Sequence, residues 1–63
     1  MMSAKLKKRV HFIGIGGIGM SALARYYMAQ NWAVSGSDLA RSSITDELIK
    51  EGVKVNLGHK SAQ

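Results

Sequence analysis

The sequence predicts an α/β fold in which a βαβαβ unit forms a three-stranded parallel sheet with the strand order 3-2-1. Short runs rich in β-branched residues alternate with segments that suit helices, and the connections between them are short. A glycine-rich stretch, residues 14–19, stands between the first strand and the first helix. At 63 residues the chain is one small domain at most, and we expect it to be part of a larger one.

The composition argues against several classes of protein. Hydrophobic residues make up 46% of the chain and charged residues 21%, which is usual for a folded domain. There is no cysteine, so we expect no disulfide and no metal site. Four of the nine basic residues lie together near the N-terminus, and no aromatic residues interleave with the others. The net charge of +5 therefore does not predict a nucleic-acid partner.

The N-terminus resembles a signal peptide only superficially. Lysines precede an apolar stretch, but that stretch contains His11 and four glycines, which oppose helix formation. Its longest run without glycine is far too short to span a bilayer. We therefore expect a cytoplasmic protein with no membrane partner.

The first half of the chain predicts a strand and a helix. Residues 1–8 lack periodicity and predict a disordered basic N-terminus, which leaves residues 9–63 as a partial domain. Residues 9–14 predict a strand that is buried on both faces. A helix is expected from Ile18 or Gly19 to about Gln30, with Asn31 in the left-handed conformation after it. Two sets of residues have the spacing of a helix face: Ile18, Ala22, Tyr26 and Ala29, or Leu23, Tyr27 and Gln30.

The second half predicts a strand, a helix and a strand. Residues 32–36 predict the second strand, with Ser37 and Asp38 at its carboxyl end. Ser42 or Ser43 can cap the next helix, and residues 43–46 have the spacing of a capping box. The expected apolar stripe of this helix is Ile44, Leu48 and Ile49, and Gly52 ends it. Residues 53–57 alternate as the third strand, which places Gly58 and His59 at its carboxyl end.

Gly14, Gly16 and Gly19 match the pattern G-x-G-x-x-G in the context that gives it meaning, after a strand and at the start of a helix. The first glycine permits a tight turn, the second lets a pyrophosphate approach the backbone, and the third allows close packing of helix and strand. The helix N-terminus then offers N–H groups and a partial positive charge to phosphates. The further donors would be Gly17, Ile18, Met20 and Ser21. The alternative is a turn that serves strand-to-helix geometry alone.

Two polar residues follow strands at the edge where α/β folds bind ligands. Asp38 lies nineteen residues after Gly19, where dinucleotide-binding folds place an acid on a ribose, so the residues alone favour NAD. Asp38 could instead cap the loop that follows it. His59 is equally open to a ligand role and a structural one, whereas His11 is expected to be packed or bonded within the fold. The chain has no phosphate loop for ATP and no nucleophile with a base, so we expect no catalytic residue.

Several segments together resemble the Mur ligase family, and within it the branch that joins L-alanine to UDP-N-acetylmuramate. They are HFIGIGGIGMS (residues 11–21), VSGSD (residues 34–38), Thr45, Leu48, Gly52 and the pair Gly58-His59. The resemblance runs from about Arg9 to His59. Asn31 departs from it, since a glycine is expected there.

The resemblance implies a Rossmann-like N-terminal domain that binds the UDP part of the substrate in peptidoglycan synthesis. Carried over by position, the diphosphate would be surrounded by Gly16, Gly17, Ile18, Gly19, Met20 and Ser21. Ser37, Asp38 and His59 would meet the uridine. ATP and Mg²⁺ would act in the full-length enzyme, on central and C-terminal domains that this chain lacks, so the fragment would bind no cofactor and be inactive alone.

Two other functions remain open on the residues alone, the NAD-binding domain of an oxidoreductase and a stand-alone nucleotide-binding module. The strand order also leaves the first strand at an edge of the sheet. Because an unpaired apolar edge invites association, we expect the 63-residue chain to be loosely folded or to self-associate through this edge.

Overall fold

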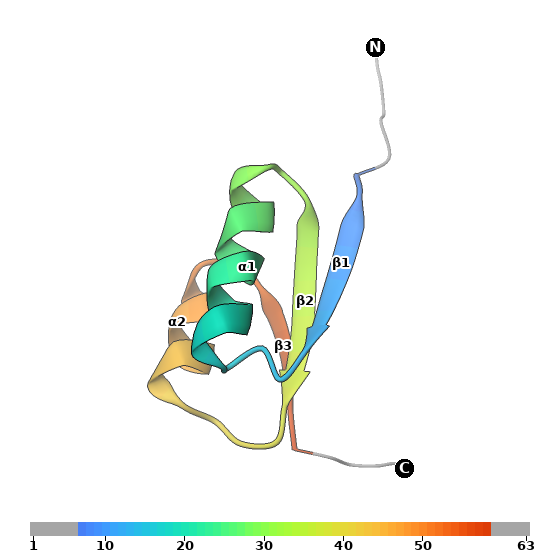
Figure 1. The fold of residues 1–63 in the computed structure, drawn as a ribbon. Coiled ribbons are helices and arrows are strands. Elements are labelled where there is room, and N and C mark those ends of the chain that lie inside the picture. Colours follow the sequence, from blue (N-terminus) through green and yellow to red (C-terminus); the bar gives the residue numbers. More distant parts are fainter. Residues whose placement is uncertain (1–6, 59–63) are drawn as a thin grey trace.

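A computed structural model describes residues 7–58, which form a parallel sheet with two helices packed on it (Figure 1). The elements in chain order are β1 (Arg9–Ile13), α1 (Ile18–Ala29), β2 (Ala33–Asp38), α2 (Ser43–Lys50) and β3 (Lys54–Leu57). The three strands pair in parallel in the order β1-β2-β3, with β2 in the centre. The predicted fold class and strand order are confirmed.

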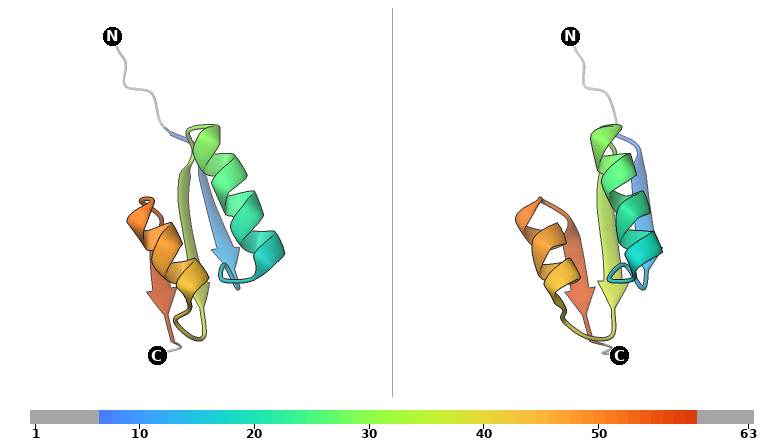
Figure 2. Two further views of the ribbon diagram at one scale, coloured as in Figure 1. Left: turned by 90° about the vertical axis from the view of Figure 1, so that its left-hand side faces the viewer. Right: turned by 60° about the vertical axis from the view of Figure 1, so that its left-hand side comes forward.

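Both helices cover the same face of the sheet (Figure 2). Each crossover moves one strand in the same direction across the sheet, and right-handed crossovers in one direction place their helices on one side. Phe12 lies beside Gly36 and Gly36 beside Val55 on the face that the helices cover. The core fills the space between the two layers and consists of Phe12, Ile15, Ala24, Val34, Leu48 and Val53. Neither helix of residues 7–58 is long and apolar enough to cross a membrane.

The opposite face of the sheet is open within the described residues, so the expectation that β1 is buried on both faces is wrong there. Phe12 is buried against the helices, whereas Ile13 is 78% exposed. His11 also lies on the open face, where its Nδ1 atom is 2.8 Å from the Ser35 hydroxyl oxygen. An apolar strand sequence predicts two covered faces, but two crossovers in one direction supply helices for only one of them.

The buried face of α1 is neither of the two predicted sets. Ser21 and Ala24 are buried, while Ile18 is 82% exposed and Tyr26 57% exposed. The reason is that α1 carries a single charged residue, Arg25, and is apolar around most of its circumference. Apolar spacing therefore cannot select one face of this helix.

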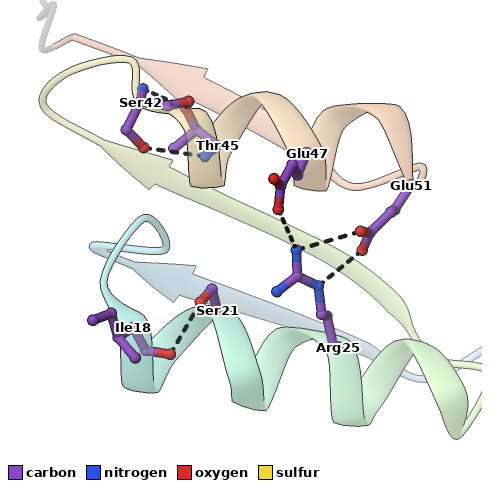
Figure 3. Close-up of polar contacts among 7 residues, drawn as sticks. All are labelled: Ile18, Ser21, Arg25, Ser42, Thr45, Glu47 and Glu51. Atoms are coloured by element: carbon purple, nitrogen blue, oxygen red, sulfur yellow. Dashed lines mark hydrogen bonds and ion pairs between the residues drawn. The ribbon is translucent and has the colours of Figure 1, made fainter.

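The ends of the helices follow their local sequence signals. Asn31 after α1 has a φ of +70°, which confirms the predicted left-handed residue. The capping box of α2 lies one residue before the predicted one. The Ser42 hydroxyl accepts from the Thr45 N–H at 3.1 Å, and the Thr45 hydroxyl oxygen accepts from the Ser42 N–H at 2.8 Å (Figure 3). Asp46, which the prediction used, forms an ion pair with Arg41 instead.

The close packing of helix layer and sheet occurs at Gly36, not at Gly19 as the glycine pattern predicted. A Cβ atom on Gly36 would lie 2.7 Å from the Ile15 Cβ and 2.8 Å from the Phe12 carbonyl oxygen. A Cβ atom on Gly19 would have no atom within 4 Å. Gly36 therefore makes room for Ile15, which follows β1 and is completely buried over the middle of β2.

Replacing Gly36 by alanine should destabilise the fold more than the same change at Gly19. At Gly36 the new Cβ meets a backbone oxygen and the branch point of Ile15, so we expect a loss of about 1–3 kcal/mol in the free energy of unfolding. At Gly19 the space is open, and alanine in a helix is more favourable than glycine by about 0.5–1 kcal/mol. Urea unfolding followed by circular dichroism measures both variants. Equal stability would contradict the packing role of Gly36.

Within residues 7–58 one edge of β1 has no pairing strand, and we expect this edge to make the 63-residue chain self-associate. Ile13 lies in this edge strand and its apolar side chain is exposed. Ile13→Lys should therefore lower the constant of self-association, because it adds a charge at the edge. Leu39→Lys is the matched control, because Leu39 is 72% exposed but lies outside the strands. Sedimentation equilibrium at several concentrations measures the effect. A monomer with a sharp, concentration-independent melt would contradict the prediction.

Candidate functional site

The turn between β1 and α1 is tied to the carboxyl end of β2. The N–H groups of Gly14 and Ile15 both donate to the Ser37 carbonyl oxygen, at 2.8 and 3.0 Å. Gly14 has a φ of +76°, which confirms the predicted tight turn, and the Gly17 N–H closes the turn on the Gly14 carbonyl at 3.0 Å. The turn therefore lies at the edge of the sheet where all three strands end (Figure 1).

The N-terminus of α1 has no internal cap. Gly17 is the N-cap residue, so it offers no side chain to the first turn, and no acidic residue lies in that turn. The first helical hydrogen bond runs from the Ser21 N–H to the Gly17 carbonyl at 2.8 Å. The N–H groups of Ile18, Gly19 and Met20 have no acceptor within residues 7–58. Free N–H groups and the positive end of the helix dipole together favour an anion at this point.

Only half of the residues predicted to surround a diphosphate have free backbone donors. The Gly16 N–H donates to the Asp38 carboxylate at 2.6 Å, and the Gly17 N–H is used inside the turn. Ser21 is 4% exposed, and its hydroxyl donates to the Ile18 carbonyl at 3.0 Å (Figure 3). The donors without an acceptor in residues 7–58 are therefore those of Ile18, Gly19 and Met20, and a Cβ atom on Gly19 would meet no atom within 4 Å.

The residues predicted to meet a uridine are not gathered into one cluster within residues 7–58. Asp38 ends β2, and its second carboxylate oxygen accepts from the Leu39 N–H at 2.8 Å, so the loop-capping alternative is also realised. Ser37 lies in register with Ile13 and Asn56, on the open face of the sheet. Consecutive strand residues project to opposite faces, which separates the Ser37 and Asp38 side chains. His59 lies outside the described residues.

The contact between Gly16 and Asp38 was not predicted, because it joins residues 22 positions apart. A Cβ on Gly16 would lie 2.6 Å from the Asp38 Oδ2 atom and 3.1 Å from the Thr45 Cγ2 atom. Thr45 is completely buried at the start of α2. The second glycine of the pattern is thus required by its neighbours in the fold, whatever binds outside the turn. Nothing in the glycine pattern itself distinguishes this reason from ligand approach.

Ion pairs of Arg25 join α1 to α2 and to the residue that caps its C-terminus. The Arg25 guanidinium donates to Glu51 at 3.0 Å and lies 3.3 Å from Glu47 (Figure 3). The hydrogen bond to Glu51 is the largest cause that raises the pKa of Arg25; desolvation opposes it, and the charges of Glu51 and Glu47 add to the rise. These side chains are largely exposed, so they contribute little to stability and add no acid or base at the turn. Among residues 7–58 no three acidic, His or Cys side chains gather to hold a metal ion.

The parallel βαβαβ unit and the turn that opens α1 define the class of this chain as a partial Rossmann-like α/β domain. Comparison with known families is more specific. The model of the Mur ligase family, described as its catalytic domain, matches residues 9–63, and the chain belongs to this family.

Relatives of known name agree with the family match. The chain is 65% identical over 49 residues to a UDP-N-acetylmuramate–L-alanine ligase of Porphyromonas gingivalis, which covers 78% of the chain and 11% of the relative. Ligases of the same name from Campylobacter jejuni and Brachyspira hyodysenteriae are 57% identical over 54 residues and 50% identical over 60. These two matches cover 86% and 95% of the chain, and 12% and 13% of the relatives. The chain thus spans only a small part of the relatives it matches.

The cap of α2 should contribute measurably to stability, because Thr45 supports the turn from this helix. Ser42→Ala removes the acceptor for the Thr45 N–H, and we expect the free energy of unfolding to fall by about 1 kcal/mol. Ser43→Ala is the control, since Ser43 is exposed and takes no part in the cap. Chemical unfolding of both variants gives the difference. A larger effect at Ser43 would contradict the observed capping box.

Proposed function

We propose that the chain is the N-terminal, nucleotide-sugar-binding part of an ATP-dependent ligase that joins L-alanine to UDP-N-acetylmuramate in peptidoglycan synthesis. The observation that carries the proposal is the uncapped start of α1, whose free N–H groups lie in a chain of the Mur ligase family. The names of relatives 50% to 65% identical to the chain support this choice of substrate over NAD.

The N–H groups of Ile18, Gly19 and Met20 would hold the diphosphate of the substrate. A diphosphate brings the negative charge that the helix N-terminus favours, and its oxygens accept hydrogen bonds as the absent side-chain cap would. Gly16, Gly17 and Ser21 would shape this site through the bonds they make within the turn and the helix. Gly19 would let the diphosphate approach without obstruction.

The uridine would lie toward the carboxyl ends of β2 and β3. The Gly58 N–H donates to the Asp38 carbonyl at 2.9 Å, which brings the chain after β3 beside the end of β2. His59 follows Gly58 directly in sequence and would contact the uridine together with Ser37 of the neighbouring strand.

The ligase reaction would need parts of the protein beyond this chain. ATP and Mg²⁺ would act on a central domain, and a C-terminal domain would complete the site, in an enzyme of the cytoplasm. The chain holds neither a phosphate loop for ATP nor a nucleophile with its base, so we propose that it binds substrate and is inactive alone.

Ile18→Pro tests the diphosphate site by removing one donor. Proline is well tolerated at the first helical position, and Gly17 before it already has the extended conformation that proline requires, with φ −71° and ψ 152°. We expect unchanged stability and about tenfold weaker binding of UDP-N-acetylmuramate, because a hydrogen bond to a charged group is lost. Titration into the ¹⁵N-labelled chain, followed by NMR, measures even weak affinity.

The control variant is Ile18→Ala, which keeps the N–H group and removes most of the exposed side chain. It should bind as the unchanged chain does. NAD serves as the control ligand and should bind more weakly than UDP-N-acetylmuramate. Binding of NAD without binding of UDP-N-acetylmuramate would contradict the proposed function and favour an oxidoreductase domain.

A further inference from the structure

Both carboxylate oxygens of Asp38 accept hydrogen bonds from the protein's own backbone. One carboxylate oxygen accepts from the Gly16 N–H at 2.6 Å and the other from the Leu39 N–H at 2.8 Å. We propose that Asp38 is a positioning residue, whose carboxylate holds the glycine turn in the register that aims the free N–H groups of α1 at the diphosphate. This inference rests on the proposed function and gives Asp38 a role other than contact with the uridine.

The hydrogen bonds of the turn support this role because they run in strict order. Gly14 and Ile15 donate to the Ser37 carbonyl, and the next N–H group, that of Gly16, donates to the side chain of Asp38. Three consecutive N–H groups are thus held by two consecutive residues at the end of β2. Asp38 supplies the last of these anchors before the helix begins.

Without the carboxylate the Gly16 N–H would lose its acceptor in a partly buried position. A buried donor that lacks a partner is unfavourable, so the turn would rearrange to find one. The donors that follow, from Ile18 to Met20, would move with it because they belong to the same short segment. The orientation of these N–H groups therefore depends on Asp38, which need not contact the ligand.

The packing around Gly16 strengthens the anchor. Gly16 lies against both the Asp38 carboxylate and the Thr45 methyl group, and the absence of a Cβ is what lets all three meet. Thr45 is fixed in turn by its three hydrogen bonds with Ser42. The turn is thus held between the end of β2 and the start of α2, and Asp38 is the polar contact in that arrangement.

The effect of removing Asp38 on the binding of two ligands distinguishes a positioning role from two alternatives, an acid with no role and an acid that binds uridine. A carboxylate near a bound diphosphate repels it, so removing an acid with no other role should tighten the binding of any such anion. An acid that binds uridine should matter for UDP and not for pyrophosphate, which has no uridine. A positioning acid should matter equally for both, because both need the same N–H groups.

The test compares UDP and inorganic pyrophosphate on the ¹⁵N-labelled 63-residue chain and on two variants. Asp38→Ala removes both acceptor oxygens, and Asp38→Asn keeps one. Asp46→Asn is the control, since Asp46 is an acid of α2 whose partner is Arg41. We expect Asp38→Ala to weaken both ligands by the same factor of about ten, Asp38→Asn to weaken both less, and Asp46→Asn to leave both unchanged. Weaker UDP binding with unchanged or tighter pyrophosphate binding would overturn the proposal.

The Gly16 amide proton gives a readout that needs no ligand. In Asp38→Ala its chemical shift should change and its exchange with solvent should become faster, with smaller shifts at Ile18, Gly19 and Met20. If the unchanged chain binds neither ligand, the proposed function fails. The amide measurements then decide by themselves whether Asp38 positions the turn. Unchanged amides from Gly16 to Met20 would overturn it. If Asp38→Ala does not fold, the same measurements on Asp38→Asn decide.

Discussion

The Ser37 carbonyl oxygen at the end of β2 is the acceptor on which the rest of the arrangement depends. It receives the N–H groups of both Gly14 and Ile15, and so fixes where the chain turns after β1. The same two bonds set Ile15 over Gly36, where it becomes the completely buried link between strand and helix layer. One acceptor thus determines both the course of the glycine turn and the packing beneath it.

The two helices differ in how the N–H groups of their first turns are satisfied. The start of α2 is capped internally by Ser42 and Thr45, and its first turn also contains an acid, Asp46. The start of α1 has a glycine cap and no acid, so its N–H groups remain available to something outside the described residues. A helix terminus with unsatisfied donors is less stable than a capped one, and a bound anion supplies the missing acceptors. A nucleotide diphosphate is the anion that we propose for that role.

The sequence could predict the features that depend on residues close together in the chain. Alternating strand and helix segments predict the fold and the strand order, and Gly14 and Asn31 mark their left-handed turns. The buried face of α1 could not be predicted, because a helix that is apolar on most sides gives no directional signal. The bond from Gly16 to Asp38 and the packing of Ile15 on Gly36 join residues 21 or 22 positions apart, and they exist only once β2 lies beside β1. The glycine pattern predicts a ligand site at the turn where the structure has N–H groups without acceptors in residues 7–58, but it could not separate the glycines needed for packing from those groups.

The most direct test of this account is a crystal structure of the chain with UDP bound. The account predicts diphosphate oxygens within hydrogen-bond distance of the N–H groups of Ile18, Gly19 and Met20, with the Gly16 N–H still on the Asp38 carboxylate. A diphosphate bound away from the start of α1, or one that takes the Gly16 N–H from Asp38, would contradict it.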